Sequence, residues 1–255
     1  MRIAAIYDVH GNLPALEAVL EEVAELRPEA VVVGGDAVWG PMPRETLTKL
    51  LEVDLPKHFI RGNADRVLAE LMSGKDISEE VPEKTRRVAA WVAQQLEPGD
   101  EELLLNWHRT VRLAANGLGE ILFCHATPQD DTTIFTRLTP EDRLRPLFED
   151  EAANLVVCGH THMQTDRLIG KVRVVTAGSV GKHHGERGAY WVLIDADVHF
   201  KCTLYDFEDA GRRVRETAYP EAEEFAAGSI LRPQSEAETL KIFEPVSLGG
   251  SYTKD

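Results

Sequence analysis

The sequence lacks the features that would assign a chain of this size to a specialised class of protein. Its 255 residues include three cysteines, Cys124, Cys158 and Cys202, which show no paired spacing. We expect all three to be buried small hydrophobic residues in a reducing compartment. No apolar run approaches the roughly 18 residues of a transmembrane helix, and the apolar stretch that ends at Asp8 is too short for a signal peptide. These absences predict a cytoplasmic protein that does not associate with membranes.

Basic residues are also scarce. The chain has 28 Lys and Arg against 43 Asp and Glu, a formal net charge of -15. A surface built for the nucleic-acid backbone needs a basic face, so nucleic acid is an unfavoured partner. A small phosphorylated molecule such as a nucleotide remains compatible, because bound cations can reverse the local field. The length allows one large domain or two small ones, and a homo-oligomer is equally compatible with the composition.

Short apolar runs alternate with amphipathic stretches, which is typical of a sheet with helices on its faces. We expect strands at 2–7, 30–33, 58–60, 120–124, 155–158 and 172–176. Helices are expected from the N-cap Asn12 to Pro28, then at 44–52, 64–96 with a break at 73–74, and 144–153. The alternation after Ala189 predicts a hairpin that turns near 195–197. For the acidic, weakly periodic segment after Glu208 we expect a peripheral helix and a frayed terminus.

Polar side chains stand at the ends of five apolar runs: Asp8 and His10, Asp36, Asn63, His125, and His160 and His162. In open α/β sheets, ligands bind beyond the carboxyl ends of the strands, so these side chains would meet at one rim. Residues two apart, such as Asp8 and His10, point to the same side in extended backbone. A single aspartate at a strand end is usually a cap and a single histidine is usually structural. Five coincidences together favour a metal site instead.

The donor types indicate which metals would bind. A mixture of histidine, aspartate and asparagine suits Mn, Fe, Zn, Co or Ni better than Ca or a plain Mg site. Seven ligand-type residues are too many for one tetrahedral ion. Two ions about 3.5–4 Å apart, bridged by one carboxylate, fit the number of ligands.

Five motifs in this order resemble those of the calcineurin-like metallophosphoesterase family: DVHGN at 8–12, GGD at 34–36, GNAD at 62–65, CHA at 124–126 and GHTH at 159–162. The resemblance extends over residues 1 to about 205. The segments GDAVWGP and AGSVG further resemble a compact prokaryotic branch, similar to small phosphodiesterases and diadenosine tetraphosphate hydrolases. These motifs are specific for a fold and a metal site, and much less so for a substrate.

The resemblance implies an α/β (α+β) fold in four layers, a β-sandwich of two mixed sheets flanked by helices. It implies a metallophosphoesterase domain at 1–205, with 206–255 as a peripheral extension of the same domain. One metal would be held by Asp8, His10 and His162, and the other by Asn63, His125 and His160, with Asp36 bridging them. Asp36 and Asn63 are thereby also candidate catalytic residues. Mn is the first expectation for both ions. A hydroxide that bridges them would attack phosphorus in line.

One position departs from the family pattern. The motif usually carries a histidine, the candidate proton donor to the leaving oxygen, where this chain has Ala64. His183, His184 and His108 are candidate replacements, although an exposed polar loop is the simpler interpretation of the first two. Asp65 either orients a ligand or water, or caps the following helix. The arginines considered as phosphate clamps, none of them assigned, are Arg44, Arg61, Arg137 and Arg187.

The missing acid shapes the predicted function. General acid catalysis is typically worth about 10²–10⁴-fold in rate, so its loss favours substrates that need little protonation. We therefore expect a phosphodiester or a nucleotide phosphoanhydride with a good leaving group. The alternatives are a serine/threonine-type protein phosphatase and a non-catalytic metal-binding scaffold, for which a retromer subunit of similar fold is the precedent.

Overall fold

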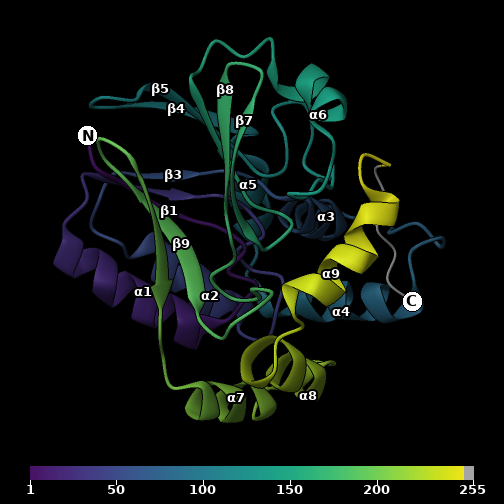
Figure 1. Cartoon of the computed structure of the whole chain (residues 1–255). Helices are drawn as coiled ribbons and strands as arrows, with labels where there is room; N and C mark the ends of the chain where they lie inside the picture. The colour runs from purple at the N-terminus through teal and green to yellow at the C-terminus, as the bar shows by residue number, and fades with distance from the viewer. Residues whose placement is uncertain (250–255) are drawn as a thin grey trace.

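Two five-stranded mixed sheets pack face to face in the computed structural model, which describes residues 1–249 (Figure 1). The first sheet has the order β10-β9-β1-β2-β3 and consists of β1 (Ile3–Ile6), β2 (Ala30–Val33), β3 (Lys57–Phe59), β9 (Ala189–Ile194) and β10 (Val198–Thr203). The second has the order β4-β5-β6-β8-β7 and consists of β4 (Thr110–Ala115), β5 (Gly119–Cys124), β6 (Leu155–Cys158), β7 (Gln164–Ile169) and β8 (Val172–Ala177).

Helices cover the outer faces of both sheets. The side of the first sheet carries α1 (Leu13–Leu26), α2 (Pro43–Leu51), α3 (Asn63–Met72), α4 (Glu83–Gln95), α5 (Asp100–Leu105), α7 (Phe207–Arg215), α8 (Ala222–Phe225) and the π-helical turn Ala226–Leu231. The second sheet is covered by α6 (Glu141–Phe148). The chain then continues into α9 (Glu236–Phe243) and a 3-10 turn, Glu244–Val246. The predicted four-layer fold is confirmed.

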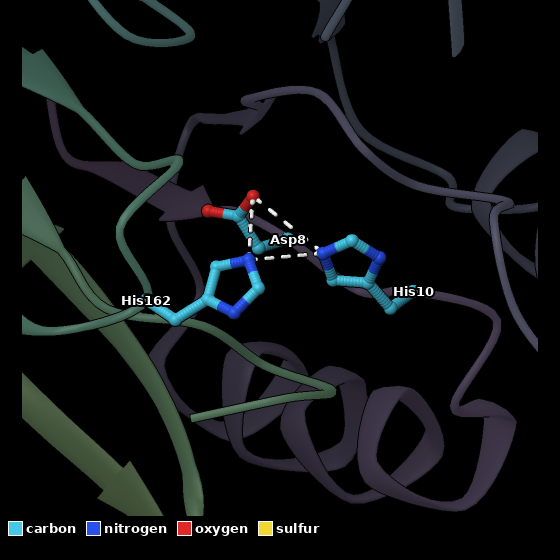
Figure 2. Close-up of side chains that lie close together, drawn as sticks. All are labelled: Asp8, His10 and His162. Atoms are coloured by element: carbon cyan, nitrogen blue, oxygen red, sulfur yellow. Dashed lines mark hydrogen bonds and ion pairs between the residues drawn. The ribbon is translucent and has the colours of Figure 1, made fainter. Parts of the chain in front are cut away.

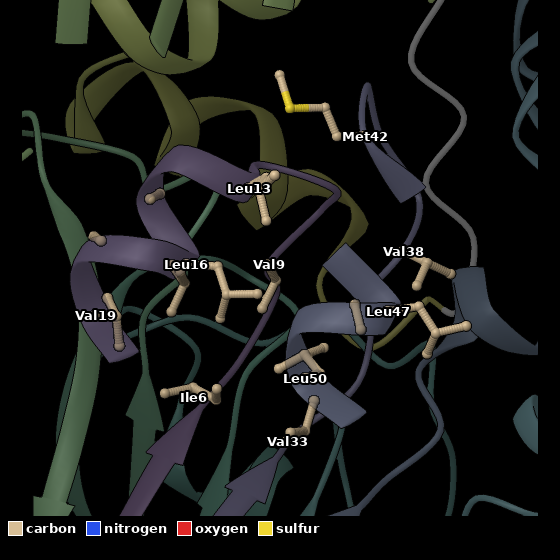
Figure 3. Packing of buried hydrophobic residues seen from close by; sticks show 14 of the residues in the cluster. Ile6, Val9, Leu13, Leu16, Val19, Val33, Val38, Met42, Leu47 and Leu50 are labelled. Atoms are coloured by element: carbon tan, nitrogen blue, oxygen red, sulfur yellow. The ribbon is translucent and has the colours of Figure 1, made fainter. Parts of the chain in front are cut away.

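Strand β1 explains why both faces of the first sheet are buried. Its side chains alternate, so Ile3 and Ala5 face the second sheet in the core between the sheets, whereas Ala4 and Ile6 belong to the cluster under the helices. The strand is therefore apolar at every position, as expected where both faces of a sheet are covered. Figure 3 shows the helix side, where Ile6 and other apolar side chains of the cluster pack under α1 and α2.

Most predicted elements are confirmed, and local chemistry explains their bounds. Asn12 accepts a hydrogen bond from the backbone N–H of Ala15 at 3.3 Å and so caps α1. The predicted break in the helix at 64–96 separates α3 from α4. The hairpin of β9 and β10 turns where it was expected. The strand expected at 58–60 begins and ends one residue earlier, as β3.

Other expectations were wrong or incomplete. The helix predicted at 144–153 is α6, which starts at Glu141 and ends at Phe148. The acidic first turn of α6 stabilises an earlier start than the apolar spacing suggested. Strands β4 and β7 and helix α5 were not predicted; β4 and β7 are edge strands with exposed positions, so their apolar signal is weak.

The described part of the predicted extension, residues 206–249, contains more than the one helix expected there. Val214, Phe225 and Ile230 are buried in the same apolar cluster as α1 and α2. The expected frayed terminus falls mostly on residues 250–255, which lie outside the described residues. The domain boundary at residue 205 stays a prediction.

Two further sequence expectations concern burial. Cys124 and Cys158 are buried as predicted, but Cys202 is exposed, because it lies on the edge strand β10. Within residues 1–249, no helix is both long enough and apolar enough to cross a bilayer.

Candidate metal centre

The loops after five strands bring the predicted ligands together. Strands β1, β2 and β3 are parallel neighbours in the first sheet, and β5 and β6 are parallel neighbours in the second. Their carboxyl ends therefore deliver ligands from two sheets, not from the rim of one open sheet as the strand pattern alone suggested. The two sides are joined directly, because the backbone N–H of His160 donates to Asp8 Oδ2 at 2.9 Å.

The backbone at these ligands is left-handed, not extended. Seven non-glycine residues have a positive φ within residues 1–249, and five of them are predicted ligands: Asp8, His10, Asp36, His160 and His162. Such conformations are uncommon and cost of order 1–3 kcal/mol each, so their concentration here points to a functional site. The expectation that Asp8 and His10 share a side through strand alternation was therefore wrong. Tight left-handed turns bring them together instead.

The first group of donor atoms comes from Asp8, His10 and His162, whose side chains point toward one another in Figure 2. The two Nε2 atoms of the histidines are 3.0 Å apart. Asp8 Oδ1 lies 3.5 Å from Nε2 of His162 and 3.9 Å from Nε2 of His10. This oxygen is buried and has no hydrogen-bond partner among the described residues. Because an orphaned buried carboxylate oxygen is costly, the arrangement fits a cation among the three donors.

The second group comes from Asn63, His125 and His160. The side-chain amide of Asn63 has one end 3.1 Å from both His125 Nε2 and His160 Nδ1. With its oxygen at that end, Asn63 faces the lone pairs of the two histidine nitrogens. A cation between the oxygen and the two nitrogens would then hold these three atoms together. Asn63 therefore fits as a metal ligand with its oxygen turned inward, although it would donate hydrogen bonds if its nitrogen were there.

Asp36 lies between the two groups. Its Oδ1 accepts a hydrogen bond from the backbone N–H of Ala64 at 2.9 Å. Its other oxygen, Oδ2, is 3.9 Å from Nε2 of His10 in the first group and 3.6 Å from Nε2 of His125 in the second. The geometry suits a carboxylate that contacts two cations at once.

Backbone carbonyls orient three of the histidines. Nδ1 of His10 lies 3.2 Å from the carbonyl oxygen of Trp39, and Nδ1 of His125 lies 2.9 Å from that of Gly34. In His160 it is Nε2 that faces a carbonyl, that of Thr132 at 3.1 Å. A carbonyl can only accept, so each of these nitrogens carries the proton in the neutral imidazole. The other nitrogen of each ring then keeps its lone pair for a metal, as is usual in metal sites.

Buried charges around the centre shift the pKa values of its residues. Burial raises the pKa of Asp8 to about 6, although the charge of His125 opposes this shift. Burial, reinforced by His162, lowers the pKa of His10 to about 3. Burial alone would lower the pKa of His125, but the charge of Asp36 outweighs it and raises that pKa to about 10. The buried carboxylates of Asp8 and Asp36 thus interact closely with the neighbouring histidines, and a bound divalent cation would balance their negative charge.

Asp65 holds the backbone around Asp36. Its carboxylate is fully buried and accepts hydrogen bonds from the N–H groups of Asp36 at 2.7 Å, Ala37 at 3.0 Å and Gly62 at 3.0 Å. Of the two predicted roles, Asp65 therefore caps α3 and at the same time fixes the residue proposed to bridge the metals. Gly62 leaves no room for a side chain, because a Cβ there would lie 2.1 Å from Asp36 Oδ1.

The other candidate residues are placed less centrally. His183 is only 7% exposed and stacks on Tyr190 with ring centroids 3.4 Å apart, so the expected exposed loop was wrong for this residue. Burial, together with His184, lowers the pKa of His183 to about 3, so at neutral pH it is not an imidazolium acid. The ring of His184 stacks on that of His162 at 5.5 Å. His108 lies exposed before β4.

Each arginine considered as a phosphate clamp has another partner. Arg44 pairs with Asp100 and Arg137 with Glu236. Arg61 donates to the carbonyl of Leu105, and the guanidinium of Arg187 lies 4.7 Å from the ring centroid of Phe207. The sequence interpretation missed Arg66, which lies beside the second group. Arg66 follows Asn63 by three residues at the start of a predicted helix, and this spacing puts both side chains on one helix face. The spacing could therefore have identified Arg66 from the sequence.

Metal loading should stabilise the protein measurably. At 100 times the dissociation constant, a ligand of the folded state adds about 2.7 kcal/mol, which for this chain length corresponds to roughly 5–10 °C in Tm. We expect chelator-treated protein to gain this much on addition of Mn²⁺, measured by calorimetry. His10→Ala should gain less, because it lacks one donor. An equal gain in the variant, or none in the wild type with any of the five metals, would contradict the site.

Comparisons with known proteins agree with the fold. A model of the calcineurin-like phosphoesterase superfamily domain matches residues 1–198. A hypothetical protein of Pyrococcus horikoshii OT3 has a similar structure, with a TM-score of 0.77 and 20% identity over 92% of this chain and 99% of that one. A metallophosphoesterase of Sphaerobacter thermophilus gives a TM-score of 0.69 and 24% identity over 90% and 99% of the two chains. A search of curated proteins found no match.

Proposed function

Because the chain belongs to the calcineurin-like phosphoesterase superfamily, we propose that it hydrolyses a phosphodiester or a phosphoanhydride with the help of two divalent cations. The observation that carries the proposal is the position of Asp36 Oδ2 between the two groups of donor atoms. Asp8, His10 and His162 would hold one cation, and Asn63, His125 and His160 the other. Mn²⁺ is the proposed metal, with Fe, Zn, Co or Ni as alternatives of similar donor preference.

The bound cations would lower the pKa of a water molecule and neutralise charge on the phosphoryl oxygens. The residues of the chain supply a preorganised frame for this chemistry. The carbonyls of Trp39, Gly34 and Thr132 fix the histidine rings, and Asp65 fixes the backbone of Asp36. These contacts exist before substrate arrives, so little reorganisation remains for the reaction itself.

The alanine at position 64 narrows the proposed substrate. Ala64 stands at the start of α3, and its backbone N–H is engaged by Asp36. His183 is buried and not protonated at neutral pH, so it supplies no replacement acid. We therefore propose a small phosphorylated substrate whose leaving group is already a stable anion, such as a nucleotide phosphate or a phenolate.

A substrate screen tests the proposal. Metal-stripped protein reloaded with Mn²⁺ should hydrolyse bis(4-nitrophenyl) phosphate or a dinucleoside polyphosphate faster than a phosphoserine peptide. Preference for the peptide would support the protein-phosphatase alternative. Metal binding without turnover of any of the three would support a non-catalytic scaffold.

Restoring the acid should change the substrate preference. In Ala64→His we expect the phosphoserine peptide, a monoester whose alkoxide leaving group needs protonation, to be hydrolysed about 100-fold faster, the lower range of general acid catalysis. Bis(4-nitrophenyl) phosphate should gain far less, because 4-nitrophenolate leaves without protonation. Ala64→Asn is the matched control, polar but unable to act as an acid. Equal acceleration of both substrates, or none of the monoester, would count against the role assigned to this position.

A further inference from the structure

Arg66 lies beside the second metal group and has no role so far. On α3 it follows Asn63 by three residues, so the two side chains share a helix face. Its Nε and Nη2 donate to Asp131 Oδ2 at 2.7 Å and Oδ1 at 3.1 Å, a two-pronged pair. The backbone oxygen of Asp131 is in turn 3.1 Å from the side-chain amide of Asn63. The guanidinium is therefore braced next to a predicted metal ligand.

The loop that braces Arg66 is itself fixed. The carboxylate of Asp130 accepts hydrogen bonds from the backbone N–H groups of Thr132 at 2.8 Å and Thr133 at 2.6 Å. The carbonyl of Thr132 then orients His160. Asp131 thus stands in a short turn whose backbone contacts two ligands of the second group, Asn63 and His160. The position of the guanidinium relative to that group is set by this turn.

The guanidinium is accessible and permanently charged. The side chain of Arg66 is 32% exposed, so a solute can reach it. Hydrogen bonding to Asp131 raises the pKa of Arg66 above its ordinary value although burial opposes this, and Asp36 of the metal centre contributes to the rise. Asp131 occupies Nε and Nη2, and within residues 1–249 Nη1 has no hydrogen-bond partner. One edge of the fork is therefore available to another acceptor.

Chemistry connects this cation with the missing acid. When an anhydride P–O bond breaks without protonation, the departing phosphate carries the full negative charge, and a fixed cation can stabilise it instead of a proton. Arginine suits this task, because its planar fork binds phosphate oxygens in two-pronged fashion and does not lose its proton. Arg66 shares a face of α3 with Asn63, so the cation lies on the side of the second group.

We propose that Arg66 binds the leaving phosphate of a phosphoanhydride substrate, an inference that rests on the proposed function. Water adds its oxygen to the attacked phosphorus and releases a proton to solvent. The bond from that phosphorus to the bridging oxygen breaks, and its electron pair stays on the bridging oxygen of the departing phosphate, which Arg66 holds. The site should therefore prefer phosphoanhydrides to phosphodiesters as substrates.

The test compares two leaving groups in Mn²⁺-loaded protein. Arg66→Ala should lower kcat/KM for diadenosine tetraphosphate by about 100-fold, as for removal of one charge-stabilising donor. The loss on bis(4-nitrophenyl) phosphate, whose leaving group is not a phosphate, should be at least about tenfold smaller. Arg66→Lys should recover part of the loss. Arg44→Ala is the control, because Arg44 is 33% exposed and is also paired with a carboxylate, its Nη1 donating to both oxygens of Asp100.

Binding gives a readout independent of turnover. Titration calorimetry with inorganic phosphate should show at least about tenfold weaker binding to Mn²⁺-loaded Arg66→Ala than to the wild type, the scale of a charged hydrogen bond. Metal content and Tm, measured on the same samples, should match the wild type. Unchanged phosphate affinity, or equal losses on both substrates, would overturn the role of Arg66.

The two proposals fail in different ways. If the wild type hydrolyses neither substrate, the proposed function itself fails. If it hydrolyses the aryl diester but not the anhydride, the proposed function stands and the inference about Arg66 fails.

Discussion

Asp36→Asn is expected to reduce phosphoester hydrolysis by more than about 100-fold. Mutating a residue that contacts a metal ligand typically costs up to about 100-fold, and Asp36 is itself a predicted ligand. Among residues 1–249, Asp36 Oδ2 is the one carboxylate atom within 4 Å of histidine nitrogens in both groups. An amide in its place keeps the shape but removes the negative charge that two neighbouring cations need. If the amide nitrogen takes the position of Oδ2, no lone pair remains there at all.

Steady-state kinetics on bis(4-nitrophenyl) phosphate with saturating Mn²⁺ measures this effect, and metal analysis of the same samples reports occupancy. We expect fewer than two ions per chain in the variant. Asp166→Asn, on the edge strand β7, is a suitable control because Asp166 pairs with Arg173, which is not a predicted ligand. Full turnover by Asp36→Asn would refute the metal mechanism.

Asp65→Ala is expected to destabilise the metal-free protein by about 3 kcal/mol or more. The change leaves three backbone N–H groups, those of Asp36, Ala37 and Gly62, without their acceptor, and each unsatisfied buried donor costs about 1–3 kcal/mol. The same loss frees the strained backbone of Asp36, whose φ is 49°. Metal affinity should therefore fall as well, by about 10–100-fold.

Urea denaturation with and without Mn²⁺ separates the two effects. Glu238→Ala is the matched control: Glu238 occupies the same third position of α9, caps the backbone of Ser235, but is exposed. That variant should lose no more than about 1 kcal/mol and none of the metal affinity. Comparable destabilisation by the two substitutions would show that Asp65 acts as an ordinary helix cap.

The candidate ligands could be found from the sequence because parallel strands end at a common edge. Each apolar run is short and is followed by a side chain with a lone pair that can bind a metal. Predicting where the strands end therefore also predicts which residues are candidate ligands. The resemblance to a family then supplied the sandwich, which the strand pattern alone did not specify. Edge strands such as β4 and β7 escaped prediction because half-exposed strands lack a continuous apolar signal.

The contacts that tune the centre could not be predicted in this way. Asp65 reaches Asp36 across 29 residues, and Arg66 reaches Asp131 across 65. No periodicity links such positions, because they meet only when loops from different strands fold over one another. The burial of His183 is of the same kind, since it depends on the ring of Tyr190 packing against it.

The sequence by itself therefore determined which atoms could bind metal and that no proton donor stands at position 64. The tertiary structure alone decided how those atoms face each other. It placed predicted ligands from two sheets around Asp36, gave five of the seven predicted ligands a left-handed backbone and set Arg66 beside Asn63. The physical reason is that donor chemistry belongs to single residues, whereas distance and orientation arise from packing between segments far apart in the chain.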